Sequence, residues 1–144
     1  MTYVVIVTGS RSWPSAHSVA AALTQRVKMH ERLVVRHGAN PRGADLFAAA
    51  WCDRMRGLVT EQSMPADWDS NPRAAGVLRN AAMLERRPPV NEVLAFPVVC
   101  EQVGCRFDAA GPHWTHGTKD MIERADKAGV LITYPGGTPV RTRG

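Results

Sequence analysis

The sequence predicts an α/β protein in which a parallel sheet carries helices on both faces. Short apolar runs rich in β-branched residues alternate with longer segments whose apolar side chains recur at helical spacing. The composition, with 44% hydrophobic and 22% charged residues, is typical of a globular domain with a packed core. Strands that alternate with helices in this way form parallel sheets with right-handed crossovers.

The first predicted element is a strand over residues 3–8, a short run of β-branched side chains. A helix over residues 14–30 follows, because apolar side chains recur every fourth residue from Val19 to Val27. Residues 33–35 form the second strand.

A second helix is predicted over residues 44–56, where Gly57 ends it. The third strand opens at residues 58–60. The third helix covers residues 74–86, and the Pro88-Pro89 pair that follows cannot continue a helix.

The last three elements are a strand over residues 92–99, a helix over residues 118–128 and a strand over residues 130–134. Met121 lies on the inward face of this helix, and Gly129 provides its C-cap.

The length of 144 residues predicts one domain, residues 1–134, followed by a basic, flexible tail over residues 135–144. No apolar run approaches the roughly 20 residues that span a bilayer. The first residues lack the basic start of a secretory signal. We therefore expect a cytoplasmic protein with no membrane segment.

The net charge of +5 indicates an anionic partner such as a nucleotide, a nucleic acid or a phosphorylated metabolite. Arginine accounts for 15 of the 18 basic residues, and its planar fork suits phosphate and carboxylate groups. Most of this count also fits a GC-rich genome, so only arginines beside motifs carry functional weight.

Parallel α/β sheets bind ligands beyond the carboxyl ends of their strands, which directs attention to the loops there. After the first strand, Gly9 permits a tight turn, Ser10 offers a hydroxyl and Arg11 can hold a phosphate. An ordinary turn with a surface arginine is the alternative. After the second strand, Gly38 lies in the turn, and Asp45 either caps a helix or binds a ribose hydroxyl.

The third strand leads to Trp68, which either stacks on a base or covers the sheet edge. Arg79 and Asn80 lie beside the apolar stripe of the next helix, at an angle that reaches the crevice. A surface Arg79 paired with Asp67 or Asp69 is the alternative.

The last helix starts near Gly117, Thr118 and Lys119. The backbone amides, the Thr118 hydroxyl and the Lys119 ammonium at this start suit a phosphate. We expect His116 to lie close to the ligand. Ordinary capping by Thr118 is compatible with this role. The sequence lacks both a Gly-x-Gly-x-x-Gly fingerprint after the first strand and a Walker A motif. Standard dinucleotide enzymes and P-loop NTPases are therefore disfavoured.

Cysteine and histidine gather in the segment before Gly117. Cys100, Cys105, His113 and His116 form the pattern C-x4-C-x7-H-x2-H, whose two thiols and two imidazoles suit a tetrahedral zinc ion. The alternatives are a small buried Cys100, an exposed Cys105 and histidines that serve the phosphate site. Three cysteines in all argue against a disulfide framework.

The order of these motifs resembles the small DUF2493 proteins, the YspA/YpsA-related members of the SLOG superfamily found in actinobacteria and their phages. The resemblance covers about residues 3–134 and rests on segments 7–11, 37–45, 65–68, 75–83 and 117–118. It implies a Rossmann-like three-layer fold with a five-stranded parallel sheet of order 3-2-1-4-5. It further implies a homo-oligomer that senses or sequesters a nucleotide-type ligand, such as ADP-ribose, NAD or a nucleoside phosphate.

Two other functions stay open. The superfamily includes phosphoribohydrolases that cleave N-glycosidic bonds with a glutamate, but alignment on Gly117-Thr118 places Met121 at that position. Asp45, Asp67 or Asp120 would then have to supply the carboxylate. Another branch binds single-stranded DNA. The basic tail, including Arg141 and Arg143, fits that function, but the 6% of aromatic residues are too scattered for a stacking surface.

Overall fold

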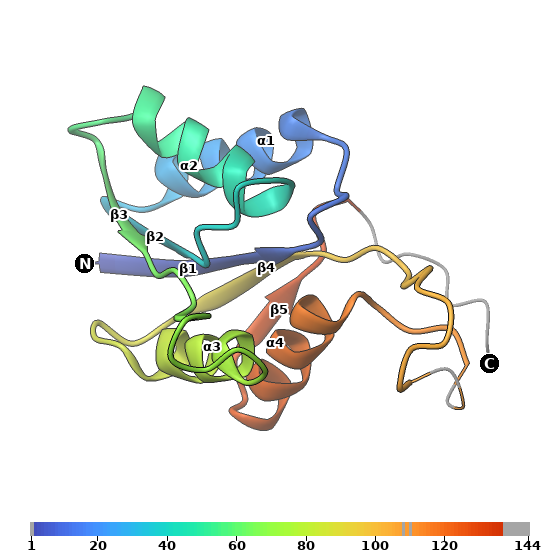
Figure 1. Ribbon diagram of the computed structural model, residues 1–144. Helices are drawn as coiled ribbons and strands as arrows, with labels where there is room; N and C mark the ends of the chain where they lie inside the picture. The colour runs from blue at the N-terminus through green and yellow to red at the C-terminus, as the bar shows by residue number, and fades with distance from the viewer. Residues whose placement is uncertain (1, 108, 110, 137–144) are drawn as a thin grey trace.

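The chain folds into a five-stranded parallel sheet between two layers of helices, as the computed structural model shows for residues 2–107, 109 and 111–136 (Figure 1). The strand order is β3-β2-β1-β4-β5, and every neighbouring pair is parallel. In chain order the elements are β1 (Thr2–Gly9), α1 (Ala16–Met29), β2 (Arg32–His37), α2 (Ala44–Arg54), β3 (Val59–Ser63), α3 (Ala75–Glu85), β4 (Glu92–Phe96), α4 (His116–Lys127) and β5 (Leu131–Thr133). The predicted fold class and strand order are confirmed.

Helices α1 and α2 cover one face of the sheet (Figure 1). Side chains alternate between faces along a strand, so Val5 and Val7 of β1 both point into this layer. There they pack with Leu23 of α1, Trp51 of α2 and Phe96 of β4. Because β1 is central and buried on both faces, it reads as a continuous apolar run.

Helices α3 and α4 cover the opposite face. Ile6, the residue between Val5 and Val7, packs here with Met83 of α3 and Met121 of α4. Met121 is fully buried. The inward position predicted for it is therefore confirmed, and it belongs to the core.

A buried carboxylate joins α1 to the sheet. Glu92 of β4 accepts hydrogen bonds from Arg26 Nε and Nη2, at 3.1 and 2.9 Å, from the Tyr3 hydroxyl at 3.0 Å and from the Thr133 hydroxyl. Burial opposes the charge, but these donors and the positive charge of Arg26 hold the pKa of Glu92 below its usual value. The sheet is thus tied to α1 by a charged group whose oxygens are hydrogen-bonded.

Several predicted boundaries differ from the structure by one to three residues, and two of these differences flank the segment between β4 and α4. The strand predicted over residues 92–99 ends at Phe96, because Pro97 cannot donate to the sheet and the chain turns away. The helix predicted from Thr118 begins at His116, with Thr115 as its N-cap. Of the predicted basic tail, residues 137–144, which include Arg141 and Arg143, lie outside the described residues. No helix among the described residues is long and apolar enough to cross a membrane.

Candidate functional site

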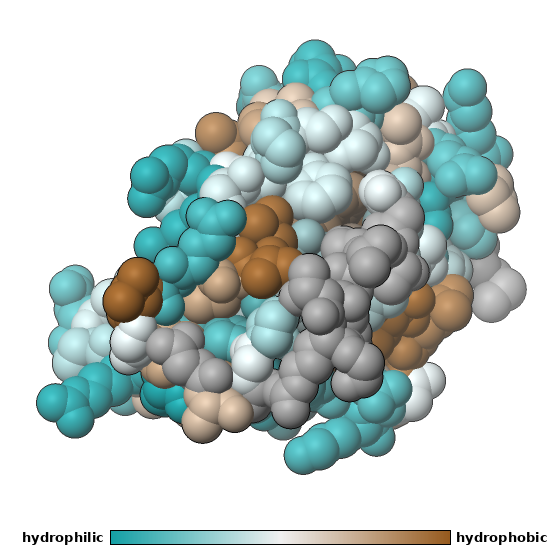
Figure 2. All heavy atoms as spheres, turned by 90° about the vertical axis from the view of Figure 1, so that its right-hand side faces the viewer, coloured by the Kyte–Doolittle hydropathy of each residue, from teal (hydrophilic) through white to brown (hydrophobic). Residues whose placement is uncertain are grey.

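A cavity of about 660 Å³ opens at the carboxyl ends of the strands, within the range typical of small-molecule sites. Figure 2 looks onto this end of the molecule, where hydrophobic patches lie among hydrophilic side chains. Every residue predicted to bind the ligand lines the cavity except Lys119: Gly9, Ser10, Arg11, Gly38, Asp45, Trp68, Arg79, Asn80, His116, Gly117 and Thr118. The fold thus brings together residues that are far apart in the sequence.

The turn after β1 is fastened to both the sheet and α2. The Ser10 amide donates to the Phe96 carbonyl at 3.2 Å, and the Ser10 carbonyl accepts from the Ala44 amide at 3.4 Å. Gly43, the N-cap of α2, has a φ of +73°, and a Cβ there would lie 2.1 Å from the Ser10 oxygen. Only glycine satisfies this backbone. The sequence pattern around Gly43 therefore fixes the position of one wall of the cavity.

Arg79 joins α3 to the end of β2. Its Nη1 donates to the carbonyl of Gly38 at 2.6 Å and to that of Met64 at 3.4 Å, and its Nε donates to Asn80 Oδ1 at 3.0 Å. It makes no pair with Asp67 or Asp69 among the described residues, so the surface alternative is wrong. Burial lowers the pKa of Arg79, the nearby carboxylates of Asp45 and Asp120 raise it, and the like charge of Arg11 lowers it further. Two guanidinium groups that repel each other across a cavity favour an anion there.

Asp45 is a buried carboxylate on the cavity wall. It lies in the first turn of α2, and its Oδ2 accepts from the Asn40 amide at 3.3 Å. Burial raises the pKa of Asp45, although the Asn40 hydrogen bond and the charges of His37 and Arg79 favour the ionised form. In either protonation state it can hydrogen-bond a ligand hydroxyl.

The first turn of α4 forms another part of the cavity wall, where the Gly117 carbonyl accepts from Asn80 Nδ2 at 3.1 Å. Gly117 and Thr118 line the cavity, and the amides of a first helical turn have no partner within the helix. The Thr115 hydroxyl does not cap them, and its Oγ1 is buried without a hydrogen-bond partner in the described part of the chain. Such a helix start suits an anion.

Lys119 is the exception among the predicted ligand-binding residues. Its ammonium bonds both carboxylate oxygens of Glu123 at 3.0 Å and lies 4.4 Å from the centroid of the Phe107 ring. It therefore points away from the cavity. The spacing Lys119 to Glu123 could have predicted this helical ion pair.

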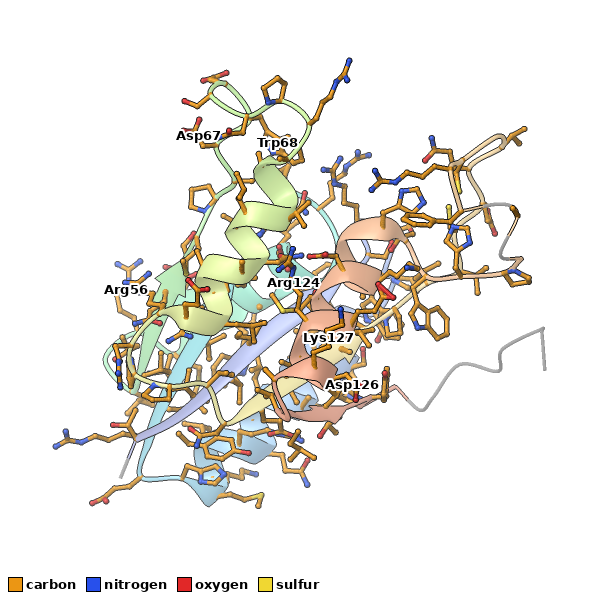
Figure 3. All side chains as sticks on the ribbon, turned by 90° about the horizontal axis from the view of Figure 1, so that it is seen from below. Arg56, Asp67, Trp68, Arg124, Asp126 and Lys127 are labelled. Atoms are coloured by element: carbon orange, nitrogen blue, oxygen red, sulfur yellow. The ribbon has the colours of Figure 1, made fainter. Side chains whose placement is uncertain are left out.

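Trp68 lies beside the first turn of α3 and is 49% exposed (Figure 3). Asp67, next to it, accepts from the Ser70 amide at 3.1 Å, and Asp120 accepts from Asn80 Nδ2 at 3.0 Å. Neither of these two candidate catalytic carboxylates lines the cavity, whereas Asp45 does.

Several cavity residues were absent from the prediction. Asn40 and Arg42 come from the loop after β2, and Glu101 and Gln102 come from the segment between β4 and α4. The first two follow a predicted strand, so the strand-end rule could have found them. The other two are placed by an irregular loop that no periodicity describes.

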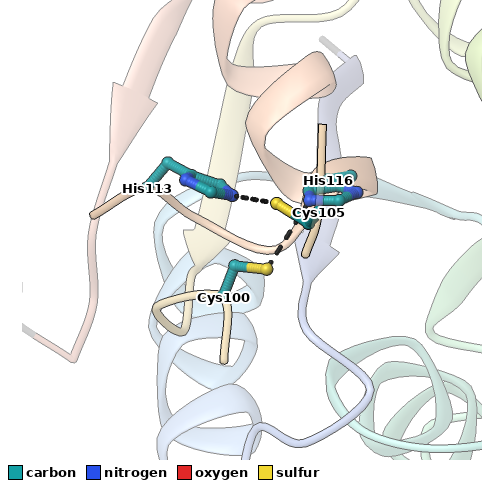
Figure 4. Close-up of side chains that lie close together, drawn as sticks. All are labelled: Cys100, Cys105, His113 and His116. Carbon is teal, nitrogen blue, oxygen red and sulfur yellow. Dashed lines mark hydrogen bonds between the residues drawn. The ribbon is translucent and has the colours of Figure 1, made fainter. Parts of the chain in front are cut away.

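The predicted cysteine and histidine cluster is assembled. The ligand atoms of Cys100, Cys105, His113 and His116 all lie within 4.8 Å of one another (Figure 4). Cys100 Sγ is 3.5 Å from His116 Nε2, and Cys105 Sγ is 3.3 Å from His113 Nε2. Cys105 is buried, which rules out an exposed thiol. We call these four residues the metal cluster, because they could hold a metal ion.

The surroundings of the metal cluster suit metal binding. His113 Nδ1 lies 2.8 Å from the Gly111 carbonyl, which can only accept, so Nδ1 carries the proton and Nε2 presents its lone pair. The Phe107 amide donates to Cys105 Sγ at 3.4 Å, a contact that favours a thiolate. Both features are typical of the outer shell of a metal site.

Comparison with known proteins agrees with this picture. The sequence profile of the YspA, cpYpsA-related SLOG family (YAcAr) matches residues 3–70. The Gene 61 protein of Mycobacterium phage D29 is 34% identical over 139 residues, which cover 94% of this chain and 98% of that protein. No solved structure matches the chain. With the predicted fold and nearly full-length similarity to a phage protein, the chain belongs to the YspA, cpYpsA-related SLOG family.

Proposed function

We propose that the protein binds a nucleotide or nucleotide-derived ligand of the ADP-ribose, NAD or nucleoside-phosphate type, as a sensing or sequestering module. The observation that carries the proposal is the convergence of Arg11, Arg79, Asp45 and the first turn of α4 on one cavity. Membership of the SLOG family fits a nucleotide-related role.

Each part of such a ligand has a complementary group in the cavity. The α4 amides at Gly117 and Thr118, with Arg11, suit the phosphate. Asp45 suits a ribose hydroxyl. The half-exposed indole of Trp68 suits a base, because aromatic rings stack on bases irrespective of their identity.

Calorimetric titration with ADP-ribose, NAD and AMP tests the proposal. Arg11→Ala removes an exposed arginine that lines the cavity, so the fold should survive. We expect about tenfold weaker binding, or about 1.4 kcal/mol, from the loss of one charge-assisted contact. Arg56→Ala removes the same charge from an exposed position outside the cavity and should bind as the wild type does. A folded wild-type protein that binds none of the three compounds contradicts the proposal.

Binding without cleavage is favoured over nucleotide hydrolysis. Met121, at the position of the phosphoribohydrolase glutamate, is buried in the core between α4 and the sheet. Asp45 and Glu101 are the carboxylates among the described cavity residues. Incubation with AMP followed by mass spectrometry should return intact AMP. Release of free adenine, abolished by Asp45→Asn, would establish the hydrolase instead.

Zinc is the metal that the donor set of the metal cluster suits best, because two thiolates and two imidazoles in a tetrahedron select it. Zinc–sulfur bonds of about 2.3 Å and zinc–nitrogen bonds of about 2.0 Å place sulfur and nitrogen about 3.5 Å apart. Two of the four sulfur–nitrogen distances are 3.5 and 3.3 Å, and all four ligand atoms lie within 4.8 Å of one another. Elemental analysis should find one zinc per chain in the wild type and none in Cys105→Ser. A metal-free wild type that takes up no added zinc contradicts this assignment.

The homo-oligomer and the binding of single-stranded DNA stay predictions. Light scattering during size-exclusion chromatography tests the first. A gel shift at moderate salt tests the second, since phosphate contacts weaken as salt rises.

A further inference from the structure

The metal cluster and the cavity share a wall. Cys100 and His116 belong to the metal cluster and also line the cavity, and Glu101, Gln102 and Thr115 line it beside them. Cys105 and His113 complete the metal cluster without lining the cavity. Two of the four metal ligands therefore lie outside the surface that a nucleotide would touch.

This wall has little else to hold it. Cys105 and Trp114 are the buried hydrophobic residues among those described between Phe96 and His116, and neither belongs to the two hydrophobic core clusters. The described backbone contacts across the segment are the hydrogen bonds from Cys100 to the His113 carbonyl at 2.7 Å and from Thr115 to the Val98 carbonyl at 2.9 Å, with a bridge between Val99 and Trp114. Val103, beyond these contacts, is 97% exposed. Segments with so few buried contacts open locally at small cost.

We infer that metal binding at this cluster positions the cavity wall and thereby sets the affinity for the nucleotide, an inference that rests on the proposed function. A bound ion would link Cys100 to His116. It would therefore attach the loop segment that carries Glu101 and Gln102 to the first residue of α4. The same turn of α4 presents Gly117 and Thr118 to the cavity. Cys105 and His113 act as positioning residues for the nucleotide. If the metal orders the wall before the nucleotide arrives, the entropy lost on ordering the wall no longer weakens nucleotide binding.

The coupling has a reciprocal form. If the metal strengthens nucleotide binding by some factor, the nucleotide must strengthen metal binding by the same factor. A metal that merely raised the stability of the fold, with no effect on the cavity, would leave the nucleotide affinity unchanged, and the nucleotide would likewise leave the metal affinity unchanged.

The test compares zinc-loaded and chelator-treated full-length protein, titrated with ADP-ribose and AMP. We expect binding to weaken about tenfold on zinc removal and to return when zinc is added. Cys105→Ser should bind as weakly as the chelated protein whether or not zinc is present. His113→Cys offers a thiolate in place of the imidazole. With zinc present, this variant should bind the nucleotide more tightly than Cys105→Ser and less tightly than the wild type. Saturating ADP-ribose should lower the dissociation constant of zinc by the same factor.

Cys52→Ser is the matched control. Cys52 is buried in the core on the α1 and α2 side, where burial and the nearby Glu61 charge raise its pKa to about 12, so it is inert toward metals. This variant should keep both zinc and nucleotide affinity.

Two outcomes separate the claims. Equal nucleotide affinity with and without zinc overturns this inference while the proposed function stands. No nucleotide binding by the zinc-loaded protein overturns the proposed function and this inference with it. If Cys105→Ser fails to fold, as circular dichroism would show, the chelated wild type supplies the comparison.

Discussion

The Arg79 guanidinium donates to the Gly38 carbonyl across 2.6 Å, and a Cβ on Gly38 would lie only 2.2 Å from Arg79 Nη1. The end of β2 and the helix α3 therefore meet at a point where only glycine leaves room for the arginine. This contact orients one of the three arginine side chains that line the cavity, Arg11, Arg42 and Arg79.

Gly38→Ala should displace the Arg79 side chain. The far end of a long side chain can move, so we expect a modest loss of stability, about 1–2 kcal/mol, with a clear loss of nucleotide affinity. Urea unfolding and calorimetric titration with ADP-ribose measure the two effects. In an Arg79→Ala background, Gly38→Ala should lower the stability and the nucleotide affinity by less than it does in the wild type. A double-mutant cycle measures this difference. Strictly additive effects would mean that the two residues are not coupled.

Gly43→Ala should lower the free energy of unfolding far more than the addition of one methyl group usually does. The new Cβ would meet the Ser10 carbonyl at 2.1 Å in a backbone with φ of +73°, and neither group can move without breaking the turn after β1. We expect a loss of about 3 kcal/mol or more, measured by urea unfolding. Gly76→Ala is the matched control, because its Cβ would meet Trp68 Cη2 at an ordinary 3.5 Å inside a helix. Equal stability of the two variants would refute this account of the turn.

Glu92→Gln should destabilise the protein by about 3 kcal/mol at pH 7, since it removes one charge from a buried pair with Arg26. The folded-state pKa of Glu92 lies below its usual 4.5, so its stabilisation is present above pH 4.5 and is lost as the pH falls through the lowered value. The difference between wild type and variant should therefore shrink in acid. Glu123→Gln, in an exposed pair with Lys119, should cost less than about 1 kcal/mol at any pH. A pH-independent difference for Glu92 would exclude the ionised pair.

Asp45→Asn separates stability from binding. The folded-state pKa of Asp45 lies above its usual 3.8, so the stability that this group contributes is present below that pH and is lost as the pH rises through the raised value. The variant should thus gain stability relative to the wild type as the pH rises above 3.8 and through the raised pKa of Asp45. Its affinity for ADP-ribose should fall about tenfold if the carboxylate holds a ribose hydroxyl. Thermal unfolding across pH, paired with titration at pH 7, measures both, and unchanged affinity would remove Asp45 from the binding account.

Periodicity and the strand-end rule predicted most of this structure. The alternation of apolar runs and helical stripes located all the strands and helices that the structure describes, because each element buries a face against a neighbour. The rule that ligands bind at carboxyl strand ends selected Arg79 and Asp45, although they lie 34 positions apart in the sequence. The predicted fold is confirmed and both residues line the cavity, because these placements depend on the geometry of the whole sheet rather than on local detail. The binding of a ligand by Arg79 and Asp45 stays a prediction.

The structure differs from the predictions where contacts of the irregular loops decide the conformation. Thr118 has the residue type preferred at a helix start, yet Thr115 takes the N-cap position, because the bridge between Val99 and Trp114 and the Thr115 hydrogen bond bring the chain back to the sheet earlier. Lys119 points to Glu123 and to Phe107, a residue of the loop whose position no sequence pattern reveals. The spacing of the cysteines and histidines predicted the four residues of the metal cluster but not that two of them, Cys100 and His116, would also line the cavity.

Native mass spectrometry of the freshly purified protein tests the central claim most directly, because it weighs the bound ligand and the metal in one spectrum. Wild-type protein incubated with ADP-ribose and zinc should carry both masses, and Arg11→Ala should keep the zinc while losing most of the ADP-ribose. The contradicting result is a spectrum of folded, zinc-loaded wild-type protein that shows no bound ADP-ribose, AMP or NAD when each compound is added at saturating concentration. That result would exclude nucleotide binding at this cavity.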